Sequence, residues 1–270
     1  MKVRKPDFQF GQALPHGSWH LEFAPAFNAA STTLPHLEPY LNRLIRRAKE
    51  QLPAAQNALR EDIDLFVRQE ANHYRRHQRH NAMLYQSGYT RLHEFEERLR
   101  ADHEKSLSEK SLRFNIAYAE GFESLGIIYT VFFFERIDDL LRDADHRVTR
   151  LWQWHLAEEF EHRTVCHDVY RALFGGYWPR LHGLLHALWH PGAYGNRVTA
   201  YLLAVDRGRM SLGEKLRFCW RAGSYQWRLI RFALPRVPAV MSPRYNPRQR
   251  RAPRGAAAWL AQWEEIRAWR

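Results

Sequence analysis

One segment of the chain combines glutamate and histidine at spacings that suit metal binding. Residues 150–171 read RLWQWHLAEEFEHRTVCHDVYR, and on a helix His155, Glu159, His162 and Cys166 would fall along one stripe. The three-residue spacing of Glu159 and His162 lets a carboxylate and an imidazole from one helix reach the same metal ion. Cys166 is interpreted as a packing residue, because no other cysteine lies nearby in the sequence.

A second segment, QEANHYRRHQRHN at 69–81, repeats this arrangement with Glu70 and His73, and His77 lies one turn further along. One such Glu-x-x-His pair is expected about once by chance in a chain of this composition. The evidence is therefore the placement of the two copies, which fall in the second and fourth of four long predicted helices. Ferritin-like dimetal carboxylate proteins take Glu-x-x-His from two helices and one Glu from each of the other two.

The other two long predicted helices each carry glutamate in apolar surroundings. Glu38 lies in the first turns of a helix predicted over 35–51, where a carboxylate also stabilises a helix by itself. Glu120 and Glu123 lie in a very apolar helix predicted over 109–142. Burying an ionised carboxylate is costly unless it is paired or binds a metal. We expect Glu120 to be the ligand and Glu123 a neighbour or additional ligand, with a salt bridge to an arginine as the alternative.

The candidate residues form three sets. The expected metal ligands are Glu38, Glu70, His73, Glu120, Glu159 and His162. The side chains expected to orient the ligands, to move protons or to add a ligand are His77, Glu123, His155, Glu158 and Asp168. The expected aromatic pocket lining is Tyr118, Phe122, Trp154 and Phe160. The alternative for each Glu-x-x-His pair is a solvated helix face with coincidental spacing.

Capping residues, prolines and glycines place the elements that must position these groups. The bundle helices are predicted over 35–51, 54–86, 109–142 and 146–174, with a crossover helix over 90–105. Residues 1–34 are predicted to pack across the bundle of 35–176 as an irregular arm with a short helix near 19–28. Further helices near 178–190, 211–232 and 255–269 would form an extension over 177–270. The predicted fold is all-α, a ferritin-like four-helix bundle with a crossover helix and a C-terminal helical extension.

Composition narrows the class of protein. With 270 residues, 45% hydrophobic and 14% aromatic, the chain can bury a sizeable core. Its two cysteines exclude a disulfide framework and favour the cytoplasm. The segment MKVRKPDFQFGQ lacks the apolar run of a signal peptide, and the uncharged run at 125–134 is too short to span a bilayer.

The net charge of +12 suits an acidic partner, nucleic acid or an anionic membrane surface, although a solvated basic surface is the simpler interpretation. No zinc-finger spacing, RNP-like aromatic motif or bZIP pattern accompanies the charge, so nucleic acid is not favoured. Peripheral membrane contact through the basic surface and a homodimer stay open.

Four segments carry a family resemblance. These are LPHLEPYL (34–41), QEANHYRRHQRHN (69–81), AEGFES (119–124) and LWQWHLAEEFEHRTVCHDVY (151–170). They resemble the bacterial family described as predicted metal-dependent hydrolases, well over 8–175 and more loosely in the tail. The resemblance implies metal contacts at the six expected ligands, and implies metal more firmly than hydrolysis. Gly121 departs from the family pattern, which has histidine next to the glutamate.

Four carboxylates and two imidazoles without thiolates suit iron or manganese; zinc normally takes fewer carboxylates. The leading expectation is an enzyme with two metal ions, iron first and manganese or zinc as alternatives. It would activate O2 or peroxide to oxidise a small, largely apolar substrate, with an electron donor as partner. One alternative is a hydrolase that uses a metal-activated water, with His77 or Glu123 moving protons. The other is a non-catalytic metal-binding or scaffold protein.

Overall fold

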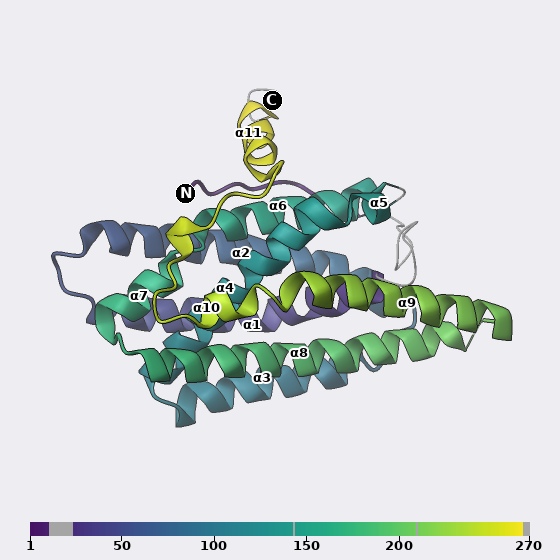
Figure 1. Cartoon of the computed structure of the whole chain (residues 1–270), viewed down its shortest axis with the longest axis horizontal. Coiled ribbons are helices and arrows are strands. Elements are labelled where there is room, and N and C mark those ends of the chain that lie inside the picture. The colour runs from purple at the N-terminus through teal and green to yellow at the C-terminus, as the bar shows by residue number, and fades with distance from the viewer. Residues whose placement is uncertain (11–23, 143, 209, 267–270) are drawn as a thin grey trace.

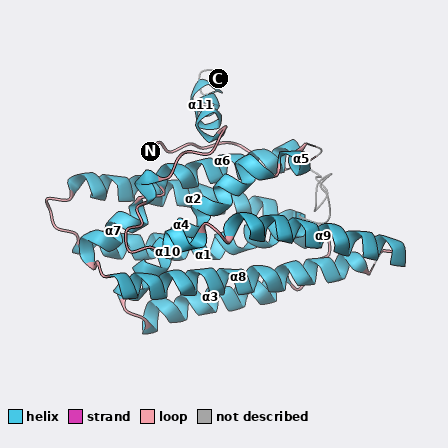
Figure 2. Ribbon diagram, in the orientation of Figure 1, coloured by secondary structure: helices cyan, strands magenta, loops and turns pink. Residues whose placement is uncertain are grey.

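The computed structural model describes residues 1–10, 24–142, 144–208 and 210–266, and within these ranges every regular element is helical (Figures 1 and 2). The all-α prediction is therefore confirmed. The helices are α1 (Ala24–Gln51), α2 (Asn57–Gln86), α3 (Leu92–Glu109), α4 (Leu112–Arg136), α5 (Asp138–Leu141), α6 (His146–His162), α7 (Val165–Leu173), α8 (Tyr177–Arg207), α9 (Leu212–Ala233), α10 (Val237–Met241) and α11 (Ala256–Ile266). A 3-10 turn, η1, spans Pro247–Gln249.

Helix α1 begins well before the predicted start at residue 35 and runs through two prolines, Pro35 and Pro39. A proline inside a helix removes the hydrogen bond to the carbonyl four residues earlier. For Pro35 this carbonyl belongs to Ser31, and the side-chain amide of Asn81 on α2 donates to it at 3.0 Å. The neighbouring helix thus supplies the missing bond, and α1 continues. Of the short helix predicted near 19–28, residues 19–23 lie outside the described residues and residues 24–28 are the first part of α1.

Two of the predicted bundle helices are broken near their ends. The predicted helix over 146–174 divides at Arg163 and Thr164 into α6 and α7, and the one over 109–142 divides at Ile137 into α4 and α5. Helices α1, α2, α4 and α6 pack against one another, with α3 connecting α2 and α4 (Figure 1). Residues at 38, 70, 73, 159 and 162 therefore come from three different helices that face a shared interior.

Helix α4 is the most apolar element of the bundle. Among the described residues it is the one helix long and apolar enough to cross a membrane, and 72% of its most apolar window is buried inside the protein. That degree of burial is typical of the central helix of a core, so the length and composition of α4 follow from its position.

Helix α8 is longer than predicted, and it is built into the bundle by close backbone contact with α4. A Cβ atom at Gly183 would lie 2.4 Å from the carbonyl carbon of Ala117, and one at Gly121 would lie 2.6 Å from Cα of Leu184. Only glycine permits this approach at both points. The histidine expected at position 121 from the resemblance would collide with α8.

Residues 1–10 form an extended segment that lies along α2 and α6 (Figure 1). The backbone carbonyls of Lys2, Arg4 and Pro6 accept hydrogen bonds from Gln69, Asn72 and Arg76 of α2. The ring of Phe8 packs 5.8 Å from that of Trp154 on α6. The segment therefore covers the seam between two helices that carry candidate ligands.

Candidate metal centre

Two groups of buried side chains bring possible ligand atoms together. In the first, one atom each of Glu38, His73, His155 and Glu159 lies within 4.8 Å of the others. In the second, the same holds for Glu70, Glu123, Glu159 and His162. The residues come from α1, α2, α4 and α6, and Glu159 belongs to both groups. This arrangement could hold two cations with Glu159 between them.

The Oε1 atom of Glu159 lies at the centre of the cluster. It is 3.3 Å from Nδ1 of His73, 3.5 Å from Nε2 of His155 and 3.4 Å from Nε2 of His162. The same nitrogen of His162 is 3.2 Å from Oε1 of Glu70 and 3.5 Å from Oε2 of Glu123. His73 and His162 thus each turn a nitrogen toward a carboxylate oxygen of another helix, and Nδ1 of His155 lies 3.9 Å from Oε1 of Glu38 on α1.

Many of these atoms are buried without a hydrogen-bond partner. The orphaned atoms are both carboxylate oxygens of Glu38 and of Glu123, Oε1 of Glu70, Nδ1 of His73, Nδ1 of His155 and Nε2 of His162. Leaving so many polar atoms unsatisfied in the interior is costly. Two divalent cations would satisfy them and would balance the charge of the four carboxylates. The residues present therefore fit a pair of metal ions.

Several side chains of the metal-free cluster have raised pKa values, so they hold protons where cations would otherwise balance the carboxylates. Burial and neighbouring carboxylates raise the pKa of Glu38 well above its ordinary value and that of Glu123 to about 8. Burial would also raise the pKa of Glu159, but His162 and His73 outweigh it and lower that pKa well below normal. Burial would lower the pKa of His162, yet Glu159 and Glu123 raise it well above normal. Protons thus occupy the cluster where cations would bind.

Two side chains orient the histidines. Nε2 of His73 donates to Glu158 at 3.1 Å, and Glu158 in turn accepts from Arg4 at 3.1 Å. His73 is therefore left with Nδ1 facing the cluster. Such a carboxylate partner fixes the tautomer and orientation of a metal-binding imidazole. This is the kind of contact that the sequence led us to expect of Glu158.

Gln69 orients His162 and was missed from the sequence. Its side-chain nitrogen donates to Glu161 at 2.7 Å and to the carbonyl of Lys2 at 3.0 Å, so its oxygen accepts from Nδ1 of His162 at 3.1 Å. His162 then presents Nε2 to the cluster. Gln69 directly precedes Glu70, and its partners lie on α6 and in the extended segment at 1–10.

Glu120, the expected ligand from α4, belongs to neither group, and this expectation is corrected. Its Oε1 accepts from Arg180 at 2.8 Å and contacts Nδ1 of His167 at 2.9 Å. Glu123, one turn further along α4, occupies the place that was expected of Glu120. The reason is that α8 supplies Arg180 to the side of α4 that carries Glu120.

Asp168 also differs from the expectation that it orients a ligand imidazole. Its carboxylate pairs with Arg248 in η1 near the protein surface. The break between α6 and α7 changes the direction of the helix before Asp168. The continuous helix assumed from the sequence therefore misplaced this residue.

His155 and His77 lie on the same side of the cluster. His155, expected either near the ligands or among them, belongs to the first group, and burial with the His73 charge lowers its pKa to about 3. The ring of His77 lies 4.9 Å from that of His155, with Nδ1 2.8 Å from the hydroxyl of Ser31 and Nε2 unpartnered. The ring of His77 therefore packs against that of His155, and His77 belongs to neither ligand group.

An apolar cavity of about 280 Å³ reaches the first group at Glu38, His155 and Glu159. The rest of its lining is Ala30, Leu34, Phe122, Leu125, Gly126, Tyr129, Trp152, Leu156, Ala187, Leu188, Pro191 and Gly192. Phe122 is the one expected pocket residue found there. Trp154 instead packs edge-on against His73 at 4.8 Å, and Phe160 lies under Arg163 at 4.1 Å.

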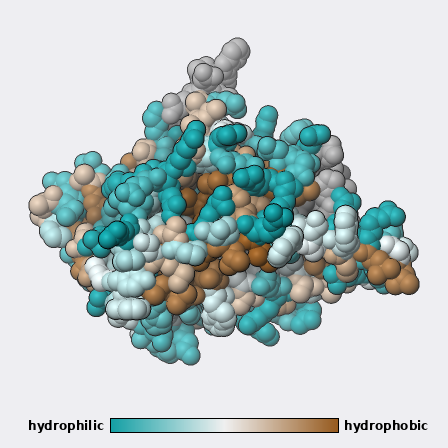
Figure 3. All heavy atoms as spheres, in the orientation of Figure 1, coloured by the Kyte–Doolittle hydropathy of each residue, from teal (hydrophilic) through white to brown (hydrophobic). Residues whose placement is uncertain are grey.

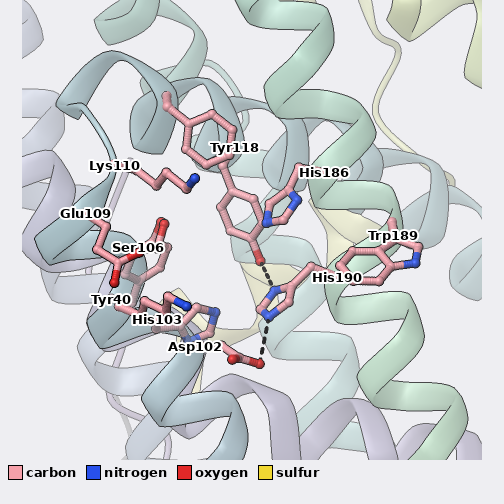
Figure 4. Close-up of a pocket in the computed structure, with 12 residues that line it drawn as sticks. Tyr40, Asp102, His103, Ser106, Glu109, Lys110, Tyr118, His186, Trp189 and His190 are labelled. Carbon is pink, nitrogen blue, oxygen red and sulfur yellow. Dashed lines mark hydrogen bonds and ion pairs between the residues drawn. The ribbon is translucent and has the colours of Figure 1, made fainter.

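Tyr118 lines a different cavity of about 330 Å³ between α3, α4 and α8 (Figure 4). Its hydroxyl lies 3.1 Å from Nδ1 of His190, whose Nε2 is 3.6 Å from Asp102. Figure 4 shows His186 and His190 projecting from α8 toward this tyrosine. The cavity shares no lining residue with the one beside the candidate ligands. Tyr118 was therefore wrongly expected in the metal-site pocket.

No curated protein and no solved structure matches the chain. One family model, described as predicted metal-dependent hydrolase, matches residues 2–251 and so covers nearly the whole chain. This match confirms the resemblance inferred from the glutamate and histidine segments, and it extends that resemblance through α8 and α9. The chain belongs to the family of predicted metal-dependent hydrolases.

Proposed function

We propose that the protein is a metal-dependent hydrolase that binds two cations and acts on a substrate with an apolar group. The observation that carries this proposal is the set of orphaned, buried ligand atoms in two groups that share Glu159. Family membership supports hydrolysis, and the apolar cavity beside Glu38 supports the substrate class.

One cation would be held by Glu38, His73 and His155, and the other by Glu70, Glu123 and His162, with Glu159 shared. Each of the four helices α1, α2, α4 and α6 then contributes a carboxylate. We infer a ferritin-like arrangement of these helices from that pattern. The oxygen-rich ligand set favours iron or manganese over zinc.

Divalent cations held by these residues would lower the pKa of a coordinated water and so would supply a nucleophile for hydrolysis. Glu158 and Gln69 hold two imidazoles in the orientation that such binding needs. Of the carboxylate and imidazole groups, Glu38, His155 and Glu159 line the cavity, whereas His77 and Glu123 do not. A proton released beside the substrate would therefore be accepted by the free oxygen of Glu38, because Glu159 would be shared by both cations, and the apolar walls would exclude bulk water.

Oxidation of an apolar substrate with O2 or peroxide is the second candidate function. It is favoured by one observation: the cavity lining has no charged or imidazole side chain other than the three candidate ligands. A hydrolase normally offers groups that bind the developing oxyanion or the leaving group. This candidate requires a pair of iron ions and an electron donor.

The cytoplasmic location of the protein stays a prediction.

Protein loaded separately with iron, manganese or zinc distinguishes the two functions. Hydrolysis of nitrophenyl esters without O2, lost in His162→Ala, would support the hydrolase. Consumption of O2 by the iron-loaded protein, without ester turnover under any metal, would refute hydrolysis of this ester class and favour oxidation. Stoichiometric metal binding with neither reaction would contradict both and favour a storage or scaffold protein.

A further inference from the structure

The exposed apolar side chains of the protein are concentrated on two helices. Within the described ranges, all ten large hydrophobic residues with high exposure lie on α8, on α9 or at the end of α9. They are Trp178, Leu185, Leu188, Trp189, Leu212, Leu216, Trp220, Trp227, Ile230 and Leu234. Figure 3 shows hydrophobic side chains along this helix pair and at its far end. Such a concentration marks an interaction surface.

Helix α9 has an apolar stripe that faces away from the protein. Leu212, Leu216, Trp220, Trp227, Ile230 and Leu234 recur at intervals of three, four and seven residues, so they share one face. The stripe extends for roughly 33 Å along the helix. Trp220 and Trp227 are 74% and 60% exposed. The opposite face is already occupied, since Tyr225 and Phe232 pack against Phe132 of α4.

The charges beside this stripe are almost all positive. Arg228 pairs with Asp139 of α5. Residues 212–233 otherwise contain Lys215, Arg217, Arg221 and Arg231, and one acidic residue. That residue, Glu214, caps the helix by accepting from Ser211. An exposed face with Trp and Leu flanked by arginine is typical of helices that lie in the interface of an anionic bilayer. A second copy of the chain would bring the same positive charges against this face, and each chain carries a net charge of +12.

Helix α9 also borders a cavity on the side opposite this stripe, toward the candidate metal centre. A second cavity, of about 250 Å³, is lined by Tyr225, Gln226 and Leu229 of α9. It shares several lining residues with the cavity at Glu38, namely Ala30, Leu34, Phe122, Tyr129, Pro191 and Gly192. The two cavities therefore adjoin, and together they extend from α9 to the candidate ligands.

We propose that α9, with the exposed face of α8, binds the surface of an anionic lipid bilayer. The chemistry that recognises the partner is an apolar stripe for the acyl region and arginines for anionic headgroups. Delivery of the substrate from this surface rests on the proposed function, whereas binding to the surface does not depend on it.

The test is co-sedimentation of the full-length protein with vesicles of phosphatidylcholine alone or mixed with phosphatidylglycerol. We expect binding to the anionic vesicles and at least tenfold weaker binding for Trp220→Ser/Trp227→Ser. Arg217→Gln/Arg231→Gln should also weaken binding, whereas Arg46→Gln/Arg47→Gln, an equal charge change at exposed positions of α1, should not. Equal binding by wild type and both α9 variants, or no binding by wild type, would overturn the proposal.

Two further readouts separate the outcomes. Metal content of the α9 variants should equal that of wild type, and His162→Ala should still bind vesicles if folded by circular dichroism. A failed metal site would therefore leave vesicle binding intact. Light scattering of lipid-free protein tests the alternative occupant: a dimer that Trp220→Ser/Trp227→Ser dissociates, with no vesicle binding, would assign the stripe to a second copy and refute the lipid surface.

Discussion

The same substitution at two positions of α4 should change stability in opposite directions. In the metal-free protein, burial and the Glu159 charge raise the pKa of Glu123 from 4.5 to about 8. A carboxyl group whose pKa is higher in the folded than in the unfolded protein lowers the free energy of unfolding as pH rises above the unfolded pKa. This destabilisation approaches its full size near the folded pKa. At pH 7 this costs about 3 kcal/mol. Glu123→Gln removes the cost, so the metal-free variant should be more stable than wild type by up to about 3 kcal/mol.

Glu120→Gln should instead destabilise the protein. It removes the carboxylate that pairs with Arg180, and both side chains are at least 94% buried. Breaking a buried pair leaves one charge without its partner and typically costs about 3–5 kcal/mol. Backbone carbonyls of Val240 and Ser242 also accept from Arg180, so the lower end is expected.

Urea unfolding of chelator-treated protein at pH 7, followed by circular dichroism, measures both effects. Titration with manganese then compares metal affinity, which should fall in Glu123→Gln and persist in Glu120→Gln. Equal destabilisation by the two variants would refute the electrostatic reasoning. Loss of metal in Glu120→Gln together with full binding by Glu123→Gln would return the ligand assignment to Glu120.

Three further outcomes follow from the contacts described above. Gly121→Ala should destabilise the protein by about 1–3 kcal/mol, because the added methyl group meets the backbone of α8. Gly223→Ala, at an exposed position of α9, should be neutral or slightly stabilising. Thermal unfolding compares the stability of the two variants. Glu158→Gln should weaken metal binding by about 10–100-fold in a calorimetric titration, because His73 loses its charged partner; unchanged affinity would count against the orienting role. Metal affinity should fall by up to about tenfold per unit as pH is lowered below 8, since a cation must displace the proton of Glu123; a flat profile between pH 6 and 8 would contradict this.

The helical segments could be predicted because they follow from local patterns. The apolar spacing in α2 and α6 and the stop at Gly175-Gly176 depend only on neighbouring residues, and they located both Glu-x-x-His pairs. The start of α1 could not be predicted, because the hydrogen bond that allows Pro35 inside the helix comes from Asn81 of another helix. Local sequence does not contain that information.

The errors within the site have a similar origin. Glu120 and Glu123 are equivalent in the sequence, and the choice between them depends on Arg180, sixty residues away on α8. The partners of Gln69 lie on α6 and in the extended segment at 1–10, which has no periodic pattern. Ligand types and spacings were therefore readable from the sequence, whereas the side chains that neutralise or orient them required the packed structure.

Two groups of ligands are proposed to hold two cations and to share Glu159. Elemental analysis of protein purified without chelator, for wild type and for Glu159→Ala and His162→Ala, tests it most directly. Two metal ions per wild-type chain, and fewer than one in each variant that keeps its helicity, are the predicted result. Two metal ions retained in both variants would contradict the claim.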